Sequence, residues 1–272
     1  MTQHNDPIRI PVDLTNPGQF FACCGLLELA DRLWPGAEVT GHFKIHRFDR
    51  ATLCISANES FSAGVIVKTF LGCERVTVDP VQPILGSDGK PTNDAKKTQP
   101  VAIGLPVNLR LNWWLDEIAG RLNAFKTWGA HKTSFGLIDD MANAIAPENA
   151  DDNLLFRSPV GMTSRIGVDP RSSWNALDTG YSPNDQNQQP VDTYPAVELL
   201  AAVGLQTFSP SVVEDTYLCS PWEQPLPAIA ARAAVSGILR MSEQRSYGFT
   251  VLSRGKFKFF SKAALTKRSK HV

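Results

Sequence analysis

Residues 11–34, PVDLTNPGQFFACCGLLELADRLW, decide the fold because they contain the start and the end of a helix with few polar side chains. Asn16 is a favourable N-cap, Pro17 suits the first helical position, and Gln19 can reach back toward the cap. Apolar side chains surround most of the turns that follow. The sequence Trp-Pro-Gly at 34–36 ends the helix. We therefore predict a helix that is mostly buried.

Strands are predicted on both sides of this helix. Residues 8–14 look extended, and Pro11 places them at a sheet edge or a bulge. Residues 39–48 alternate apolar with polar side chains, and a turn leads to a second strand at 52–57. The order strand, helix, hairpin is typical of a helix packed on a mainly antiparallel sheet, which predicts an α+β fold.

Regular and irregular segments alternate along the rest of the chain. Polar or irregular stretches at 86–100 and 157–192 are predicted to be loops, the second of them inserted into the domain. The other predicted segments are helices and a terminal strand pair, at residues 133–146, 195–206, 226–241 and 247–260. Together they suggest a single elaborated domain over residues 1–272.

The composition limits the class of protein. Of the 272 residues, 43% are hydrophobic, which suffices for a folded core and excludes disorder of the whole chain. No apolar run approaches the roughly 18 residues that cross a bilayer, and the first residues lack the features of a signal peptide. We therefore expect a cytoplasmic protein without membrane contacts. The five cysteines include no CxxC pair, so we expect reduced, partly buried thiols, no metal site and no cofactor.

The net charge of zero hides a basic C-terminal segment. Residues 240–272 contain nine Lys and Arg but a single acid, Glu243, so the rest of the chain is acidic. Such a split favours a basic end that meets a polyanion or an acidic partner protein. The alternative is a terminus that only improves solubility.

Short catalytic motifs are missing from the sequence, which contains no GxSxG, HExxH or GxxxxGK[ST] and therefore does not point to an enzyme. One predicted strand face nevertheless carries His42, Lys44 and His46. Two groups that titrate near neutral pH beside a cation could cleave RNA by acid–base catalysis without a metal. The alternative is a solvated strand face or a patch that contacts phosphates.

A basic and aromatic cluster precedes the predicted helix at 133–146, and it consists of Lys126, Trp128, His131 and Lys132. A Trp ring can stack on a base, and a Lys can neutralise a phosphate. The start of the helix also favours anions through its free N–H groups. The alternative is a core Trp beside solvated lysines.

The irregular stretch at 157–192 carries Arg157, Arg165 and Arg171 together with aromatic residues. An extended loop of this composition can clamp or splay a single strand of nucleic acid. The alternative is an ordinary long surface loop.

The C-terminal segment contributes Arg254, Lys256 and Lys258, which alternate with Phe. On a strand the two lysines would share one face, and the intervening Phe side chains would occupy the other. This pattern predicts a phosphate-contacting face backed by a core face.

Residues 11–34 resemble the start of a CRISPR-associated protein found beside type I-G (formerly I-U) effector genes. The other stretches that agree with this resemblance are the 126–132 cluster, 194–210 (YPAVELLAAVGLQTFSP) and 222–226 (WEQPL). Together they span most of the chain, but they are packing motifs rather than catalytic ones.

The resemblance implies a subunit of a Cascade-type ribonucleoprotein that pairs a guide RNA with foreign DNA in antiviral defence. The implied partners are guide RNA, target DNA, other CRISPR effector subunits and a helicase-nuclease. Such subunits are often built on RRM-like (ferredoxin-like) sheets with long inserted loops, which fits the predicted segments. A backbone-type (RAMP-like) role on guide RNA and a large-subunit role on DNA both stay open.

The main hypothesis is therefore a non-catalytic subunit that binds RNA or DNA through local basic faces. The first alternative is a guide-RNA-processing endoribonuclease that uses His42 or His46. The second is an assembly module whose basic tail docks a protein partner.

Overall fold

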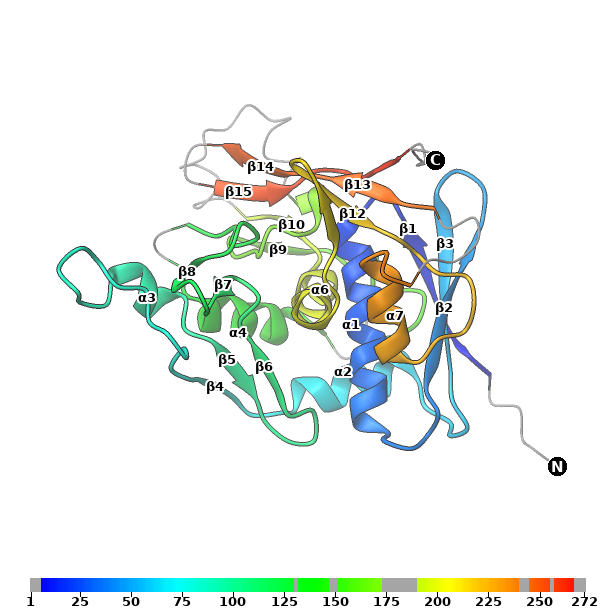
Figure 1. Cartoon of the computed structure of the whole chain (residues 1–272). Helices are drawn as coiled ribbons and strands as arrows, with labels where there is room; N and C mark the ends of the chain where they lie inside the picture. Colours follow the sequence, from blue (N-terminus) through cyan, green and yellow to red (C-terminus); the bar gives the residue numbers. More distant parts are fainter. Residues whose placement is uncertain are drawn as a thin grey trace.

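Two helices occupy the middle of the molecule in the computed structural model, which describes residues 6–129, 132–146, 151–172, 190–239, 245–254 and 257–266. They are α1 (Pro17–Leu33) and α6 (Pro195–Thr207), and nearly all of their residues are buried. They pack against each other, with small sheets and shorter helices around them (Figure 1). The prediction of a buried helix after residue 16 is confirmed.

Gly25 and Gly204 allow the main chains of α1 and α6 to touch. A Cβ atom on Gly25 would lie 2.0 Å from the carbonyl oxygen of Leu200, and one on Gly204 would lie 2.0 Å from that of Phe21. A main-chain atom cannot turn aside as a side chain can. A larger residue at either position would therefore push the two helices apart.

The start of α1 has the predicted cap. The Asn16 side-chain oxygen accepts a hydrogen bond from the Gln19 main-chain N–H at 3.1 Å, and Pro17 occupies the first turn. The Gln19 side-chain oxygen accepts a hydrogen bond from the Asp13 N–H at 2.8 Å, so it reaches back beyond the cap to the preceding strand. Trp34 is the C-cap, as predicted.

A three-stranded antiparallel sheet lies beside α1 in the order β1-β3-β2, with strands β1 (Ile8–Asp13), β3 (Arg50–Ser56) and β2 (Thr40–Ile45). Ile10, Leu53 and Phe43 are paired across the strands and fully buried on the face toward α1. Residues 222–226 close the edge of β2, because Phe43 donates a main-chain hydrogen bond to Trp222 at 2.7 Å. One face of this sheet is therefore covered and the other is open.

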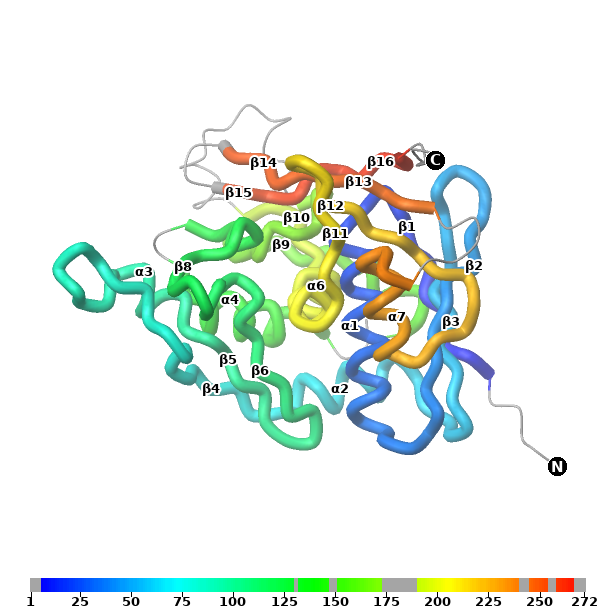
Figure 2. Tube along the Cα trace, viewed as in Figure 1, coloured from blue at the N-terminus to red at the C-terminus, as the bar shows by residue number. Residues whose placement is uncertain are grey.

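The remaining described segments build several small, mainly antiparallel sheets, so the chain is a mixed α+β protein, as predicted. The strands are β4 (Arg75–Thr77), β5 (Val101–Ile103), β6 (Leu109–Leu111), β7 (Leu115–Asp116), β8 (Arg121–Leu122), β9 (Val160–Met162), β10 (Val191–Thr193), β11 (Ser211–Val213), β12 (Thr216–Cys219), β13 (Tyr247–Phe249), β14 (Val251–Arg254), β15 (Phe257–Phe260) and β16 (Ala264–Leu265). They pair as β4-β5-β6, β7-β8, β9-β10, β11-β12-β13-β16 and β14-β15 (Figure 2). The other helices are α2 (Ala63–Leu71), α3 (Asn93–Lys97), α4 (Ser134–Ala144) and α7 (Ala228–Val235). No helix in the described ranges is long and apolar enough to cross a bilayer.

The chain uses the order strand, helix, hairpin twice. The sequence Pro-Val-Asp occurs at 11–13, at the end of β1, and at 190–192, at the start of β10, where Pro190 directly precedes the strand, and a proline begins the helix after each. The β2–β3 hairpin follows α1, and the β11–β12 hairpin follows α6. Each of the two central helices thus follows a strand and precedes a hairpin.

Three segments differ from the predictions. The loop predicted at 86–100 contains α3, which Thr92 caps by accepting a hydrogen bond from the Ala95 N–H. The stretch at 157–192 is not irregular throughout, because β9 and β10 pair near its two ends. The helix predicted at 226–241 ends at Val235, where a Gly237 with φ of 72° follows.

Candidate nucleic-acid interface

The outer face of the β1-β3-β2 sheet brings together cations from different strands. Arg9 of β1 lies opposite Cys54 of β3, which lies opposite His42 of β2, while Lys44 lies opposite Thr52. Burial raises the pKa of the Cys54 thiol, and the nearby charges of Arg9 and Lys44 partly offset this rise. Both cations therefore lie close to the same thiol, although they are distant in sequence.

The hairpin between β2 and β3 extends this surface. Arg47 and Phe48 are exposed at its tip, and 91% of Phe48 is accessible to solvent. His46 contacts the Thr52 hydroxyl at 3.0 Å, and Arg50 forms an ion pair with Asp13 at 3.1 Å. We call the surface made of Arg9, His42, Lys44, His46, Arg47, Phe48 and Arg50 the open sheet face.

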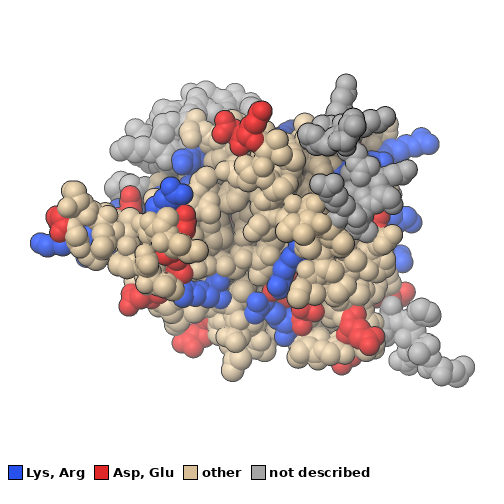
Figure 3. Space-filling view, in the orientation of Figure 1, with Lys and Arg blue, Asp and Glu red and all other residues tan. Residues whose placement is uncertain are grey.

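Three cations of the open sheet face have no anionic partner among the residues that the structure describes. No carboxylate of a described residue forms an ion pair with the side chain of Arg9, Lys44 or Arg47. Asp152 accepts a hydrogen bond from the Arg9 main-chain N–H at 3.0 Å, which leaves the guanidinium available. Figure 3 shows Lys and Arg side chains projecting at the right-hand edge, where Figure 1 places these strands. The face thus carries positive charge that the described part of the fold does not neutralise.

His42 and His46 lie on the same strand face, as predicted, but four residues apart. At a rise of about 3.3 Å per residue, their main chains are about 13 Å apart. Acid–base cleavage needs both imidazoles within hydrogen-bond distance of one phosphodiester. In addition, burial lowers the pKa of His42. This spacing supports contact with separate phosphates of a strand rather than joint action on one of them.

A second group of cations, the lysine trio, consists of Lys97, Lys126 and Lys258. The main-chain N–H of Lys258 in β15 donates to the Thr127 carbonyl at 3.1 Å, which holds β15 beside the segment that contains Lys126. Burial lowers the pKa of Lys126, and the charges of Lys258 and Lys97 lower it further, while Asp94 opposes them. The structure therefore joins two predicted residues and adds Lys97 from α3. Helix α3 and strand β15, which carry Lys97 and Lys258, lie toward the left of Figure 2, whereas β2 and β3 of the open sheet face lie toward the right.

Trp128 is a core residue, which agrees with the alternative of a core Trp rather than with a ring that stacks on a base. Only 6% of it is exposed, and its ring meets those of Trp113 and Trp114 edge-on, with centroids 6.0 and 5.3 Å away. The Lys126 ammonium lies 5.7 Å from the ring centroid. Because the ring is buried, it offers no free face on which a base could stack.

Lys132 and Arg171 are engaged within the protein. The Lys132 ammonium donates to the Ser164 hydroxyl at 2.5 Å and lies 3.7 Å from the Asp140 carboxylate. The Arg171 guanidinium binds Asp169 at 2.6 Å and lies 3.3 Å from the centroid of the Tyr194 ring. These two predicted residues therefore do not belong to the interface that the described charges support.

The other predicted cations differ in their surroundings. Arg165 is partly buried, and burial lowers its pKa although the charge of Glu198 opposes this. Arg157 is exposed on the turn before β9. Arg254 ends β14. His131 and Lys256 lie outside the described residues.

The carboxylates of Asp169 and Glu198 form a buried pair that was not predicted from the sequence, and both are fully inaccessible to solvent. Glu198 accepts hydrogen bonds from the main-chain N–H groups of Gly167 at 2.8 Å and Asp169 at 3.1 Å. Asp169 accepts another from the Asn16 side chain at 2.8 Å. Burial, together with the charge of Asp169, raises the pKa of Glu198 to about 7. Because solvent does not reach the pair, it serves the fold by fixing residues 167–169 to the starts of α1 and α6.

Four residues of the open sheet face were not predicted from the sequence as site residues: Arg9, Arg47, Phe48 and Arg50. Arg9 was within a predicted strand, but only the register of β1 on β3 places it beside Lys44. The alternation along β2 was the signal that found Lys44. If this alternation is followed beyond the end of β2, it leads to the basic and aromatic residues at the hairpin tip.

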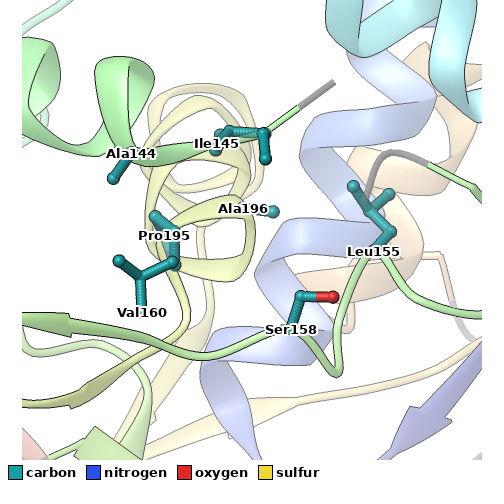
Figure 4. Close-up of a pocket in the computed structure, with 8 residues that line it drawn as sticks. Ala144, Ile145, Leu155, Ser158, Val160, Pro195 and Ala196 are labelled. Carbon is teal, nitrogen blue, oxygen red and sulfur yellow. The ribbon is translucent and has the colours of Figure 1, made fainter. Parts of the chain in front are cut away.

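A small pocket lies between the end of α4 and the start of α6 (Figure 4). Its volume is about 10 Å³, which is the space of a single water molecule. Ile145, Leu155 and Val160 line it with apolar surface, beside the hydroxyl of Ser158. It is too small for a substrate. Among the residues that the structure describes, no group of three His, Cys, Asp or Glu is placed to hold a metal ion.

Comparisons of the chain with protein-family models, with curated proteins and with solved structures give no match.

Proposed function

We propose that the chain is a non-catalytic subunit of a CRISPR type I effector ribonucleoprotein, where it binds guide RNA or target DNA through the open sheet face. The observation that carries the proposal is the exposure of Arg9, Lys44 and Arg47 on one sheet face, without a described carboxylate as partner. Gathering like charges costs free energy that an external polyanion would recover. The protein would act in the cytoplasm, in antiviral defence.

The order of elements supports an RRM-like origin for the first part of the chain. Strand β1, helix α1, strands β2 and β3 and helix α2 follow one another, and the sheet order is β1-β3-β2. A ferredoxin-like sheet would continue with a fourth strand beside β1, whereas β4 pairs with β5. The resemblance of residues 11–34 to type I-G proteins is the basis for proposing guide RNA, target DNA, other effector subunits and a helicase-nuclease as partners.

The lysine trio supports a second contact. Lys97, Lys126 and Lys258 come from three segments of the chain. The charges of Lys97 and Lys258 lower the pKa of Lys126, and the charge of Asp94 raises it. A long nucleic acid, or two strands of one complex, would contact both the trio and the open sheet face. Phosphate contacts of this kind position a subunit and leave sequence recognition to base pairing.

The test is the binding of fluorescently labelled RNA and DNA of equal length to the purified chain across a salt series. Affinity should fall steeply with salt. The double variant Lys44→Ala with Arg47→Ala should reduce the slope of log affinity against log salt by about 1.4 for a single strand. The matched control is Lys68→Ala with Lys90→Ala, which removes two exposed lysines elsewhere and should leave the slope unchanged.

Other outcomes distinguish the alternatives. Equal effects of the two double variants, or an affinity that does not depend on salt, would contradict the proposed interface. RNA cleavage that His42→Ala with His46→Ala abolishes would instead establish an endoribonuclease. Binding of an acidic partner protein without any binding of nucleic acid would establish a docking module.

A further inference from the structure

The tip of the β2–β3 hairpin has an unusual backbone. Phe48 and Asp49 both have a φ of 57°, in the left-handed region that glycine and asparagine normally supply in such turns. The Arg50 main-chain N–H donates a long hydrogen bond to the Arg47 carbonyl at 3.4 Å. A bulky aromatic residue in this conformation is strained, and such strain persists only where neighbouring structure imposes it.

The rest of the fold holds this turn through Asp49. The Leu14 N–H donates to the Asp49 carbonyl at 2.9 Å, and the Tyr247 hydroxyl donates to the Asp49 carboxylate at 2.9 Å. Tyr247 itself is a core residue of β13. The body of the protein thus fixes Asp49 from behind, and this fixes the direction in which the preceding Phe48 projects.

No described residue packs against Phe48 in a way that would explain its conformation. It is 91% exposed, and its neighbours on the chain are Arg47, which is exposed, and the anchored Asp49. A single exposed apolar side chain is ordinary. An aromatic ring held in a strained turn, beside Arg47 and Lys44, which have no anionic partner among the described residues, requires a further reason.

We propose that Phe48 stacks on an unpaired base of a single-stranded nucleic acid whose phosphates lie along Arg47 and Lys44. An aromatic ring beside a basic track is the usual platform for single strands, because every base offers a flat face. A duplex keeps these faces inside its own stack. This inference rests on the proposed function and adds the class of ligand that the open sheet face would take.

The experiment uses the full chain and three ligands of equal length: single-stranded RNA, single-stranded DNA and duplex DNA, each containing 2-aminopurine. Stacking should change the 2-aminopurine fluorescence in the single strands. Phe48→Ala should weaken binding of the preferred single strand about 5- to 100-fold and abolish that change. Phe48→Trp should keep both, and Ile118→Ala, which removes another side chain that is 92% exposed, should alter neither.

The outcomes separate the inference from the proposed function. If the duplex binds as well as the single strands, and Phe48→Ala changes neither while Lys44→Ala with Arg47→Ala weakens both, the stacking inference is wrong and the proposed function stands. If the unaltered chain binds none of the three ligands in low salt, both are wrong. A preference between the RNA and DNA single strands identifies which of the two the face takes.

Discussion

The open sheet face and the segment from Lys132 to Arg171 look alike in sequence, since both place cations beside aromatic residues, yet the structure uses them differently. In the segment, Lys132 and Arg171 are bound by Asp140 and Asp169. On the open sheet face, Arg9, Lys44 and Arg47 are exposed without such partners among the described residues, and only Arg50 forms an ion pair there, with Asp13. The positive charges of the first region therefore stabilise the fold, and those of the second are free to meet a ligand.

The largest expected effect comes from removing a cation that the fold uses. Arg171→Ala would remove the guanidinium that pairs with the buried Asp169 carboxylate, which should cost at most about 3–5 kcal/mol of unfolding free energy, because Asp169 keeps the hydrogen bonds from Asn16 and from the main-chain N–H of residue 171. Thermal or urea unfolding measures this loss, and nucleic-acid affinity per folded molecule should stay unchanged. Arg157→Ala, an exposed cation in the same stretch, is the control and should change stability by less than about 0.5 kcal/mol. If Arg171→Ala unfolds like the unaltered chain, the assignment of this region to the fold is wrong.

The second effect is a pH dependence of the same region. The pKa of Glu198 is about 7 in the folded chain, above the ordinary value of 4.5. The folded state therefore holds the proton more tightly than the unfolded state, so this contribution to stability is complete below about pH 4.5 and is lost as pH rises through about 7. The loss amounts to at most about 3 kcal/mol. Unfolding curves between pH 5 and 8 should show it, and Glu198→Gln should flatten this pH dependence whatever its effect at a single pH.

The differences between the two regions show which features the sequence could predict. Local signals sufficed for the cap at Asn16, for the alternation that exposes Lys44 and for the end of α1. The pairing of Arg9 with its neighbours depends on strand register, and the contact of Glu198 with residues 167–169 joins segments about thirty positions apart. Such contacts leave no local pattern.

Burial also decided the role of residues that the sequence found correctly as a cluster. Lys126 and Trp128 do lie together, but the three Trp rings bury one another, so that Trp128 belongs to the core. The sequence predicts a turn here, and Asp49 tolerates a positive φ, but it does not predict a left-handed Phe48, because a bulky aromatic residue rarely adopts that conformation. Its conformation follows from the hydrogen bonds that anchor Asp49.

The third effect comes from giving Lys44 of the open sheet face a carboxylate partner. Thr52 lies opposite Lys44 on the outer face, so Thr52→Glu would place a carboxylate beside a cation that now has none among the described residues. A cross-strand pair of opposite charges adds about 0.2–1 kcal/mol of stability at most. Nucleic-acid affinity should nevertheless fall about tenfold, which corresponds to about 1.4 kcal/mol. Thr52→Gln, equal in size and uncharged, should bind like the unaltered chain. Equal affinity of the Glu and Gln variants would show that the charge of Lys44 does not contribute.

The smallest effect concerns the lysine trio. Its charge is only partly offset, because the charge of Asp94 raises the pKa of Lys126 but the two side chains form no ion pair within the described residues. In this respect the trio lies between the open sheet face and the segment from Lys132 to Arg171. Lys126→Ala with Lys258→Ala should weaken binding of a long strand a few-fold and reduce its salt dependence, since two phosphate contacts are lost. Asp94→Asn should do the reverse, because it removes the charge that offsets the trio. The two variants need to be compared on a long strand and on one too short to reach both the trio and the open sheet face. If the trio is a second contact, both effects disappear with the short strand, whereas the effect of Lys44→Ala with Arg47→Ala persists.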